Sequence, residues 1–265
     1  MGWLAKSALS ASALALLCAG QASAAGDKDL RYWMRDPALR RNPAAPLVIQ
    51  ADNLVINLDT DESIPIYTHA LRVDPKFGPA YRGRACAYTE MNKMKEALAD
   101  YTKAIECDPI DESLARRNRA ELNAALKNYA AAIPDLNIML DRDPRADGLL
   151  SLRAKCYLGL KKYDLALVDL NKAIKRRGTV NFLLRERAQT YSEAHMYDKA
   201  LADYTTMIEQ AHKNDQTIAD ISTIYSDRAK VYDATGKKEL AKADRQKALD
   251  ASEDTMSLAP FRVHK

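Results

Sequence analysis

Apolar residues follow one another at steps of three and four along most of the chain, a spacing that predicts amphipathic helices with one face on a core. Between residues 78 and 109 the pattern occurs twice, first as Tyr81, Ala85 and Tyr88 and then as Ala97, Tyr101 and Ala104. Residues 92–94, Asn, Lys and Met, indicate a short polar turn between the two stripes. The stretch is therefore expected to form two antiparallel helices.

The same two-helix pattern recurs along the chain. Its first-helix alanines are Ala85, Ala120, Ala154, Ala188 and Ala229, and its second-helix alanines, twelve residues later, are Ala97, Ala132, Ala166, Ala200 and Ala241. Successive units are 35, 34, 34 and 41 residues apart, and Pro75, Pro109 and Pro144 close three of them. A period of this length predicts a repeat protein in which each helix pair packs on its neighbours.

The two ends of the repeated region depart from the pattern. Leu47, Ala51, Leu54, Tyr67, Ala70 and Pro75 keep the phase of a preceding unit, but Ser63 replaces its second-helix alanine. The β-branched residues in 47–57 leave a strand as the alternative there. Before the last unit, seven extra residues within 211–221 are expected to lengthen a helix or bulge a loop, and the lysine-rich final helix suits an end cap.

These residues resemble the tetratricopeptide repeat (TPR) family. The best-matching unit has Tyr81, Ala85, Tyr88, Ala97, Tyr101, Ala104 and Pro109 at the family's signature spacings. The resemblance implies an all-α fold, an α-solenoid of antiparallel helix pairs wound as a right-handed superhelix, with the repeat domain over 46–253. The expected repeats are a degenerate one at 44–77 and clear ones at about 78–111, 113–146, 147–180, 181–214 and 222–255.

The N-terminal segment has the pattern of a secretory signal peptide. Lys6 precedes thirteen uncharged residues, 7–19, too few to span a bilayer, and residues 22–24 are the small-x-small sequence Ala-Ser-Ala. We expect 1–24 to be cleaved and the mature chain to be exported without membrane insertion; it would be periplasmic in a bacterium and otherwise secretory or extracellular. An uncleaved anchor is the alternative. Residues 25–45 would be a flexible or capping lead-in with an exposed Trp33, and 254–265 a C-terminal tail.

Composition suits closely packed helices but identifies no partner. The chain has 44 alanines, and its 13 tyrosines greatly outnumber its 3 phenylalanines. A net charge of +4 gives no argument for nucleic acid. Cys86, Cys107 and Cys156 lack the spacing of a metal site or a redox motif, which favours buried free thiols. No catalytic constellation or cofactor motif is found.

An arginine and an aspartate sixteen residues apart occur in every clear unit. The pairs are Arg84 and Asp100, Arg119 and Asp135, Arg153 and Asp169, Arg187 and Asp203, and Arg228 and Asp244. In a helix hairpin with its turn midway, both residues lie at the same height, so we expect an ion pair inside each unit or across to its neighbour. A ladder of arginines for anionic ligands is less favoured, because each arginine has its own acid.

The resemblance places ligands in a concave groove lined by the first helices. Carried over to this sequence, it makes Arg82, Arg117, Lys155, Arg185, Gln189 and Lys230 candidate peptide-binding residues. They imply a mild preference for acidic or C-terminal carboxylate peptides, with an ordinary mixed-charge surface as the alternative. A subset of the family clamps chaperone tails; at the positions it uses, this chain has Arg82, Cys86, Asn118, Gly148 and Leu152, and only Asn118 fits.

The sequence thus predicts an exported scaffold that mediates protein–protein interactions or assembly of an envelope or secretory complex, without catalysis or cofactor. Its partners would be proteins or peptides rather than nucleic acid, with self-association as a further option. The alternatives are an accessory subunit of an extracytoplasmic enzyme, an uncharacterised enzyme, or an RNA-binding repeat protein.

Overall fold

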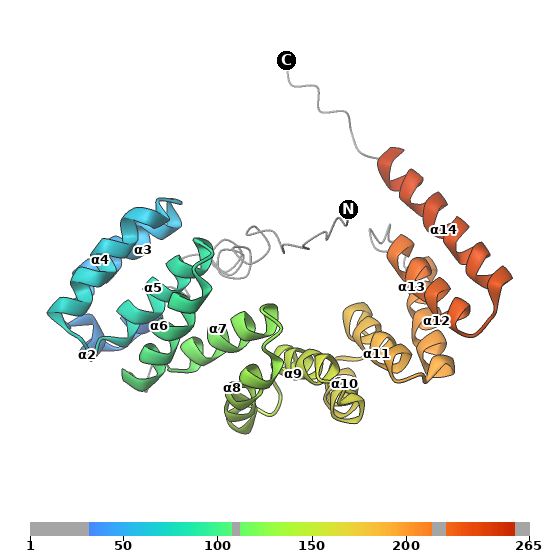
Figure 1. The fold of residues 1–265 in the computed structure, drawn as a ribbon, viewed down its shortest axis with the longest axis horizontal. Coiled ribbons are helices and arrows are strands. Elements are labelled where there is room, and N and C mark those ends of the chain that lie inside the picture. Colours follow the sequence, from blue (N-terminus) through green and yellow to red (C-terminus); the bar gives the residue numbers. More distant parts are fainter. Residues whose placement is uncertain (1–31, 108–111, 214–220, 258–265) are drawn as a thin grey trace, which may run out of the picture. The chain divides into compact units, whose positions relative to one another are not determined.

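The structure, a computed structural model, describes residues 32–107, 112–213 and 221–257, and every regular element in these ranges is helical (Figure 1). The expected fold class is confirmed: the described chain is an α-solenoid built from antiparallel helix pairs. It divides into two compact units, Met1–Pro144 and Arg145–Lys265. The expected signal peptide 1–24, the end of the C-terminal tail and Pro109 lie outside the described residues.

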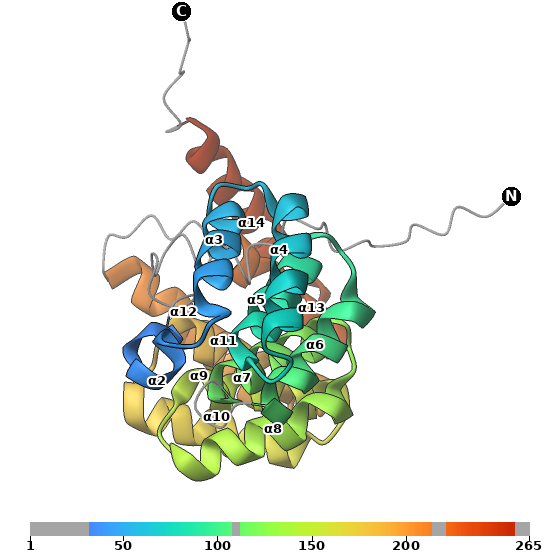
Figure 2. The same cartoon turned by 90° about the vertical axis from the view of Figure 1, so that its left-hand side faces the viewer.

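The first unit contains three helix pairs, and Figure 2 shows α3 and α4 side by side, with α5 and α6 next to them. Residues 47–56 belong to a helix rather than to the alternative strand, because Val48, Ala51 and Val55 bury one face at steps of three and four. The elements are η2 (Tyr32–Arg35), α2 (Pro37–Arg40), α3 (Ala45–Ile56), α4 (Thr60–Val73), α5 (Gly78–Glu90), α6 (Met94–Cys107), α7 (Glu112–Ala125) and α8 (Tyr129–Arg142).

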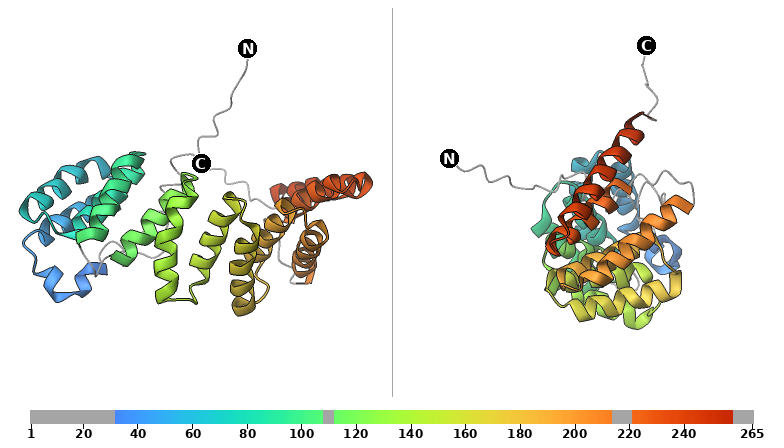
Figure 3. Two further views of the ribbon diagram at one scale, coloured as in Figure 1. Left: turned by 60° about the horizontal axis from the view of Figure 1, so that its bottom comes forward. Right: turned by 90° about the vertical axis from the view of Figure 1, so that its right-hand side faces the viewer.

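The second unit also contains three pairs, and α13 packs along α14 at its C-terminal end (Figure 3). Its elements are α9 (Asp147–Gly159), α10 (Tyr163–Arg177), α11 (Asn181–Glu193), α12 (Tyr197–Lys213), α13 (Ile221–Ala234) and α14 (Lys238–Ser257). With 17 residues, α12 is longer than α10, which has 15, so part of the seven-residue insertion extends a helix. The rest of the insertion falls in 214–220, outside the described residues.

Small residues at the helix crossings allow each pair to pack closely. The ten alanines that mark the repeat are at most 2% exposed: Ala85, Ala97, Ala120, Ala132, Ala154, Ala166, Ala188, Ala200, Ala229 and Ala241. Four residues after the second-helix alanine, a large side chain (Tyr101, Leu136, Leu170 or Tyr204) is also buried. The composition rich in alanine and tyrosine is therefore explained by close backbones with large side chains filling the space beside them.

One turn geometry joins the two helices of every pair. A residue with a left-handed backbone, φ between 58° and 74°, ends the first helix in each, namely Leu58, Asn92, Lys127, Lys161, His195 and Gly236. The next backbone N–H then donates back to a carbonyl five residues earlier, as Lys162 does to Tyr157 at 2.8 Å. This is a Schellman cap, which satisfies carbonyls that the helix end leaves without partners. Five of the six positions adopt it without a glycine.

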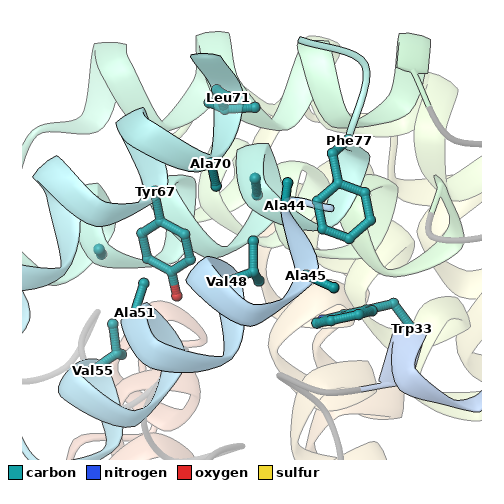
Figure 4. Close-up of a cluster of buried hydrophobic side chains, with 12 residues drawn as sticks. Trp33, Ala44, Ala45, Val48, Ala51, Val55, Tyr67, Ala70, Leu71 and Phe77 are labelled. Carbon is teal, nitrogen blue, oxygen red and sulfur yellow. The ribbon is translucent and has the colours of Figure 1, made fainter. Parts of the chain in front are cut away.

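The described part of the lead-in caps the first pair. Trp33, at the start of η2, is only 1% exposed, and its ring meets Phe77 edge to face at a centroid distance of 5.4 Å (Figure 4). Ala44, Ala45 and Val48 complete the contact from the start of α3. The expectation of an exposed Trp33 is therefore wrong, because the indole packs into the apolar cluster formed by the first helix pair and Phe77.

The first pair also contains a buried polar contact of its own. The Tyr67 hydroxyl on α4 donates to Asp52 Oδ1 on α3 at 2.5 Å, and both residues are at most 1% exposed. Gly83 on α5 makes room for this ring, since a Cβ added there would lie 2.5–2.7 Å from Tyr67 ring atoms and hydroxyl. Burial, followed by the neighbouring Asp52 charge, raises the pKa of Tyr67 well above its usual value.

Candidate interaction surface

The five arginine–aspartate pairs are brought together inside their own helix pairs. In each, the arginine of the first helix donates from Nε and Nη2 to the two carboxylate oxygens of the second-helix aspartate, over 2.7–2.9 Å. The arginine side chains are 12–22% exposed and the aspartates 2–10%. Bidentate, largely buried pairs of this kind fix geometry as well as charge.

The arginines also reach the preceding helix pair. Nη1 of the arginine donates to a second-helix side chain of that pair, from Arg84 to Thr68 (3.0 Å), Arg119 to Thr102 (2.9 Å), Arg187 to Asn171 (2.8 Å) and Arg228 to Thr205 (3.1 Å). For these four arginines, contacts therefore form both within a helix pair and between neighbouring pairs, where the sequence left the two as alternatives. Hydrogen bonding to the aspartate is the main cause that raises the pKa of Arg187 and of Arg228. These guanidinium groups are occupied by structural contacts, which favours the structural over the ligand-ladder interpretation.

In the first unit, the two candidate ligand residues differ in exposure. Arg82 on α5 is only 3% exposed, so the expectation that it lies on an open ligand face is wrong. The physical reason is that α3 and α4 both pack against α5, and the Arg82 charge lies near the buried Tyr67, whose pKa it lowers against the larger effects of burial and Asp52. Arg117 on α7 is 41% exposed, with Nε 3.4 Å from Glu121 Oε1 one turn later.

In the second unit, the candidate residues lie on α9, α11 and α13, and one carboxylate, Asp227, links two of them, Arg185 and Lys230. Arg185 Nη2 donates to Asp227 Oδ2 at 3.0 Å, and Lys230 Nζ donates to the other oxygen, Oδ1, at 2.8 Å. One pair earlier, Ser151 Oγ donates to Glu186 at 2.6 Å. Side-chain hydrogen bonds therefore connect the first helices of the three pairs, α9 to α11 and α11 to α13.

Lys155 and Gln189 are exposed in this unit, and the Lys230 side chain is 75% exposed. These groups offer ammonium and amide donors to solvent. Burial raises the pKa of Glu186, partly offset by its hydrogen bond from Ser151. Beside Lys155, burial raises the pKa of Cys156 to about 11, so that thiol stays protonated near neutral pH.

Sequence reasoning missed the two acids that connect the first helices, Glu186 and Asp227. A signal was present: the bonded residues are 35 and 42 positions apart, one more than the local repeat intervals of 34 and 41. A search for a hydrogen-bond donor and a carboxylate separated by one period plus one residue would have found both.

Within residues 32–107, 112–213 and 221–257, no group of three or more His, Cys, Asp or Glu side chains could hold a metal ion. The helices in those ranges include none with the length and apolar character needed to cross a membrane. Cys86 and Cys156 are buried and Cys107 is partly buried.

Comparison with known proteins identifies tetratricopeptide repeats at residues 78–111 and 148–179. Hsp70-Hsp90 organizing protein 1 of Glycine max is 33% identical over 95 residues, which is 36% of this chain and 16% of that protein. The chain thus corresponds to about a sixth of that relative's length. The presence of TPR repeats, which the resemblance implied, is confirmed.

Solved structures give the same fold. The C-terminal part of a TPR repeat-containing protein from Cytophaga hutchinsonii superposes with a TM-score of 0.62 at 20% identity, covering 78% of this chain and 79% of that one. A tetratricopeptide repeat protein from Parabacteroides merdae covers 95% of this chain and 94% of its own, with a TM-score of 0.55 at 23% identity. At these identities the likeness concerns the fold alone.

Proposed function

We propose that this chain is an exported scaffold that binds protein or peptide segments on the first-helix face of its second unit and so helps to assemble an envelope or secretory complex. TPR repeats mediate protein–protein interactions, and the chain contains such repeats. The observation that carries the proposal is the connected row of polar side chains on α9, α11 and α13, with Lys155, Gln189 and Lys230 open to solvent.

The chemistry of this face favours a partner segment that carries carboxylates. Lys155 and Lys230 present exposed ammonium groups, and Lys230 also donates to Asp227, which in addition holds the 37% exposed Arg185 between repeats. Exposed ion pairs contribute little each, so affinity would come from several contacts along the row. The proposed role is recognition and includes no catalytic step.

Chaperone tails are not the partner that we propose, although one relative is named for organizing Hsp70 and Hsp90. Among the positions of the chaperone-tail clamp, Arg82 is buried at 3% exposed and Cys86 at 7%. Asn118 Nδ2 lies 3.7 Å from Cys86 Sγ, within hydrogen-bond range of a sulfur. The only side chain that matches the clamp is thus already engaged inside the first unit.

The main test places a photo-crosslinking amino acid at Gln189 in the native host and identifies the adducts by mass spectrometry. We expect a discrete protein adduct that is lost in the double variant Lys155→Glu, Lys230→Glu and kept in Lys95→Glu, which changes an exposed lysine on α6. Equal adducts in all three would contradict the proposal. Recovery of RNA that dissociates with salt would instead favour the RNA-binding alternative.

Export is tested separately by fractionating the cells and measuring the intact mass of the recovered chain. We expect it outside the cytosol with Ala25 as its first residue, because residues 7–19 and 22–24 have the signal-peptide pattern. A full-length chain held in the inner membrane would support the uncleaved-anchor alternative.

A further inference from the structure

A hollow of about 370 Å³ lies between two neighbouring helix turns of the second unit. The turn from α9 to α10 forms one side and the turn from α11 to α12 the other. It is lined by Lys161, Lys162, Tyr163, Asp164, Leu165, Ala194 and Met196. None of these residues belongs to the first-helix row described above, so the hollow is a separate feature of the same unit.

The hollow is lined by two exposed apolar side chains, Leu165 and Met196, at positions where most other repeats have polar residues. Leu165 is 45% exposed and Met196 37%, and Val168, one turn beyond Leu165, is 49% exposed. At the Leu165 position the other units have Glu62, Glu96, Ala131, Lys199 and Leu240; at the Met196 position they have Asp59, Lys93, Asn128, Lys162 and Lys237. Because the helix pairs fold with polar residues there, the apolar ones are not needed for the fold.

The rim of the hollow is positively charged. Lys161 and Lys162 are both exposed, and the lining contains one carboxylate, Asp164. An apolar floor beside two ammonium groups and one acid complements a segment in which an aliphatic side chain is flanked by carboxylates. Exposed apolar side chains grouped on a polar surface are typical of contact sites.

We propose that this hollow binds an acidic–aliphatic segment of a partner protein, with an aliphatic side chain between Leu165 and Met196 and its flanking carboxylates at Lys161 and Lys162. The site goes beyond the function proposed above, since it gives the second unit a second contact point at its turn edge. The two sites share no residue, so either can fail without the other.

The test uses the full chain and a fluorescein-labelled peptide with two leucines between two pairs of aspartates, blocked at both ends. Binding is measured by fluorescence anisotropy, and the site is mapped by amide chemical shifts. We expect shifts at 161–165 and 194–196. Leu165→Glu and Met196→Lys should each weaken binding about tenfold or more, since a buried aliphatic contact is lost. Both introduce residues found at the same position in other repeats, so the fold is expected to be kept.

Leu240→Glu is the matched control, because Leu240 occupies the same repeat position and is 49% exposed but does not line the hollow. It should leave the affinity unchanged. A peptide with serines in place of leucines should not bind, and one with lysines in place of aspartates should bind about tenfold more weakly. Absence of binding, equal loss in Leu165→Glu and Leu240→Glu, or equal binding of the lysine peptide would overturn the proposal. Shifts confined to α9, α11 and α13 would also overturn it, and would support the first-helix face instead.

Discussion

The first helix pair, α3 and α4, and the second, α5 and α6, share one architecture but use different polar contacts at their crossing. In both, a second-helix tyrosine meets the residue fifteen positions earlier. Tyr67 donates to Asp52 at 2.5 Å, whereas Tyr101 lies 3.4 Å from the sulfur of Cys86. The first contact is a short bond to a carboxyl group, and the second is a weak one to a thiol.

The second pair has its strong polar contact elsewhere, between Arg84 and Asp100. The first pair has Gln50 and Ile66 at those positions and cannot form it. A degenerate repeat can therefore lose the repeated ion pair and still hold its two helices together through a different buried carboxyl, here Asp52, which faces the tyrosine.

Removing the ion pair should cost the most. Arg84→Ala or Asp100→Ala is expected to lower the free energy of unfolding by about 3 kcal/mol, because each leaves a partly buried charge without its partner. Gln50→Ala, at the same repeat position in the first pair and exposed, should change it by less than about 0.5 kcal/mol. Urea unfolding of the single variants and of the double variant gives the coupling; additive effects would show that the pair is not energetically linked.

Filling the space beside Gly83 should have the second-largest effect on stability. Gly83→Ala is expected to cost about 2 kcal/mol, because the new methyl group meets the Tyr67 ring at 2.5–2.7 Å. Gly148→Ala is the control, since a Cβ there meets nothing within 4 Å, and it should be neutral or slightly stabilising. The measurement is the melting temperature of each variant in thermal unfolding. Similar melting temperatures for the two would mean that the Tyr67 ring can move aside, contrary to its tight burial.

Deleting the two tyrosine hydroxyls compares the pairs directly. Tyr67→Phe should lower the free energy of unfolding by about 1–2 kcal/mol, because it removes the hydroxyl that donates to a buried carboxyl, and Tyr101→Phe by at most about 0.5 kcal/mol, because its contact with the Cys86 thiol is weak. The measurement is again urea unfolding. Equal losses of stability in the two variants would contradict the idea that the Tyr67–Asp52 contact replaces the ion pair in the first helix pair.

Substitutions at the turns should have small effects on stability, and these effects should be similar in the first pair and in a later one. Leu58→Gly in the first pair and Lys127→Gly in a later one should each stabilise by about 0.5 kcal/mol, because glycine tolerates a positive φ. Gly236→Ala should destabilise by about 1 kcal/mol for the same reason. If Leu58→Gly destabilised instead, the first turn would depend on its side chain, and the two regions would differ there too.

Features that recur were predictable from the sequence. Each Arg–Asp pair keeps a spacing of sixteen residues, and in an antiparallel hairpin that spacing places the two side chains at the same height. The helix pairs followed for the same reason, because the alanine phase specifies the crossing points.

Features that occur once were not predictable in the same way. Burial of Trp33 depends on Phe77, forty-four residues away, and burial of Arg82 depends on how α3 and α4 pack against α5. The link from Arg185 to Asp227 spans the seven-residue insertion, so a search at the regular period misses it. Such contacts depend on packing between elements, which periodicity alone does not specify.

A third hydrogen bond of four of these arginines, Arg84, Arg119, Arg187 and Arg228, runs to the preceding helix pair and gives the packing of neighbouring pairs a direction. Arg84, for example, is on the later helix pair, and its acceptor Thr68 is on the earlier one. The ribosome also makes the earlier pair before the later one, so the acceptor is already present when the arginine leaves the ribosome. A newly made first helix then has a docking point on finished structure before its own second helix exists, and the chain can be assembled in the order in which it is translated.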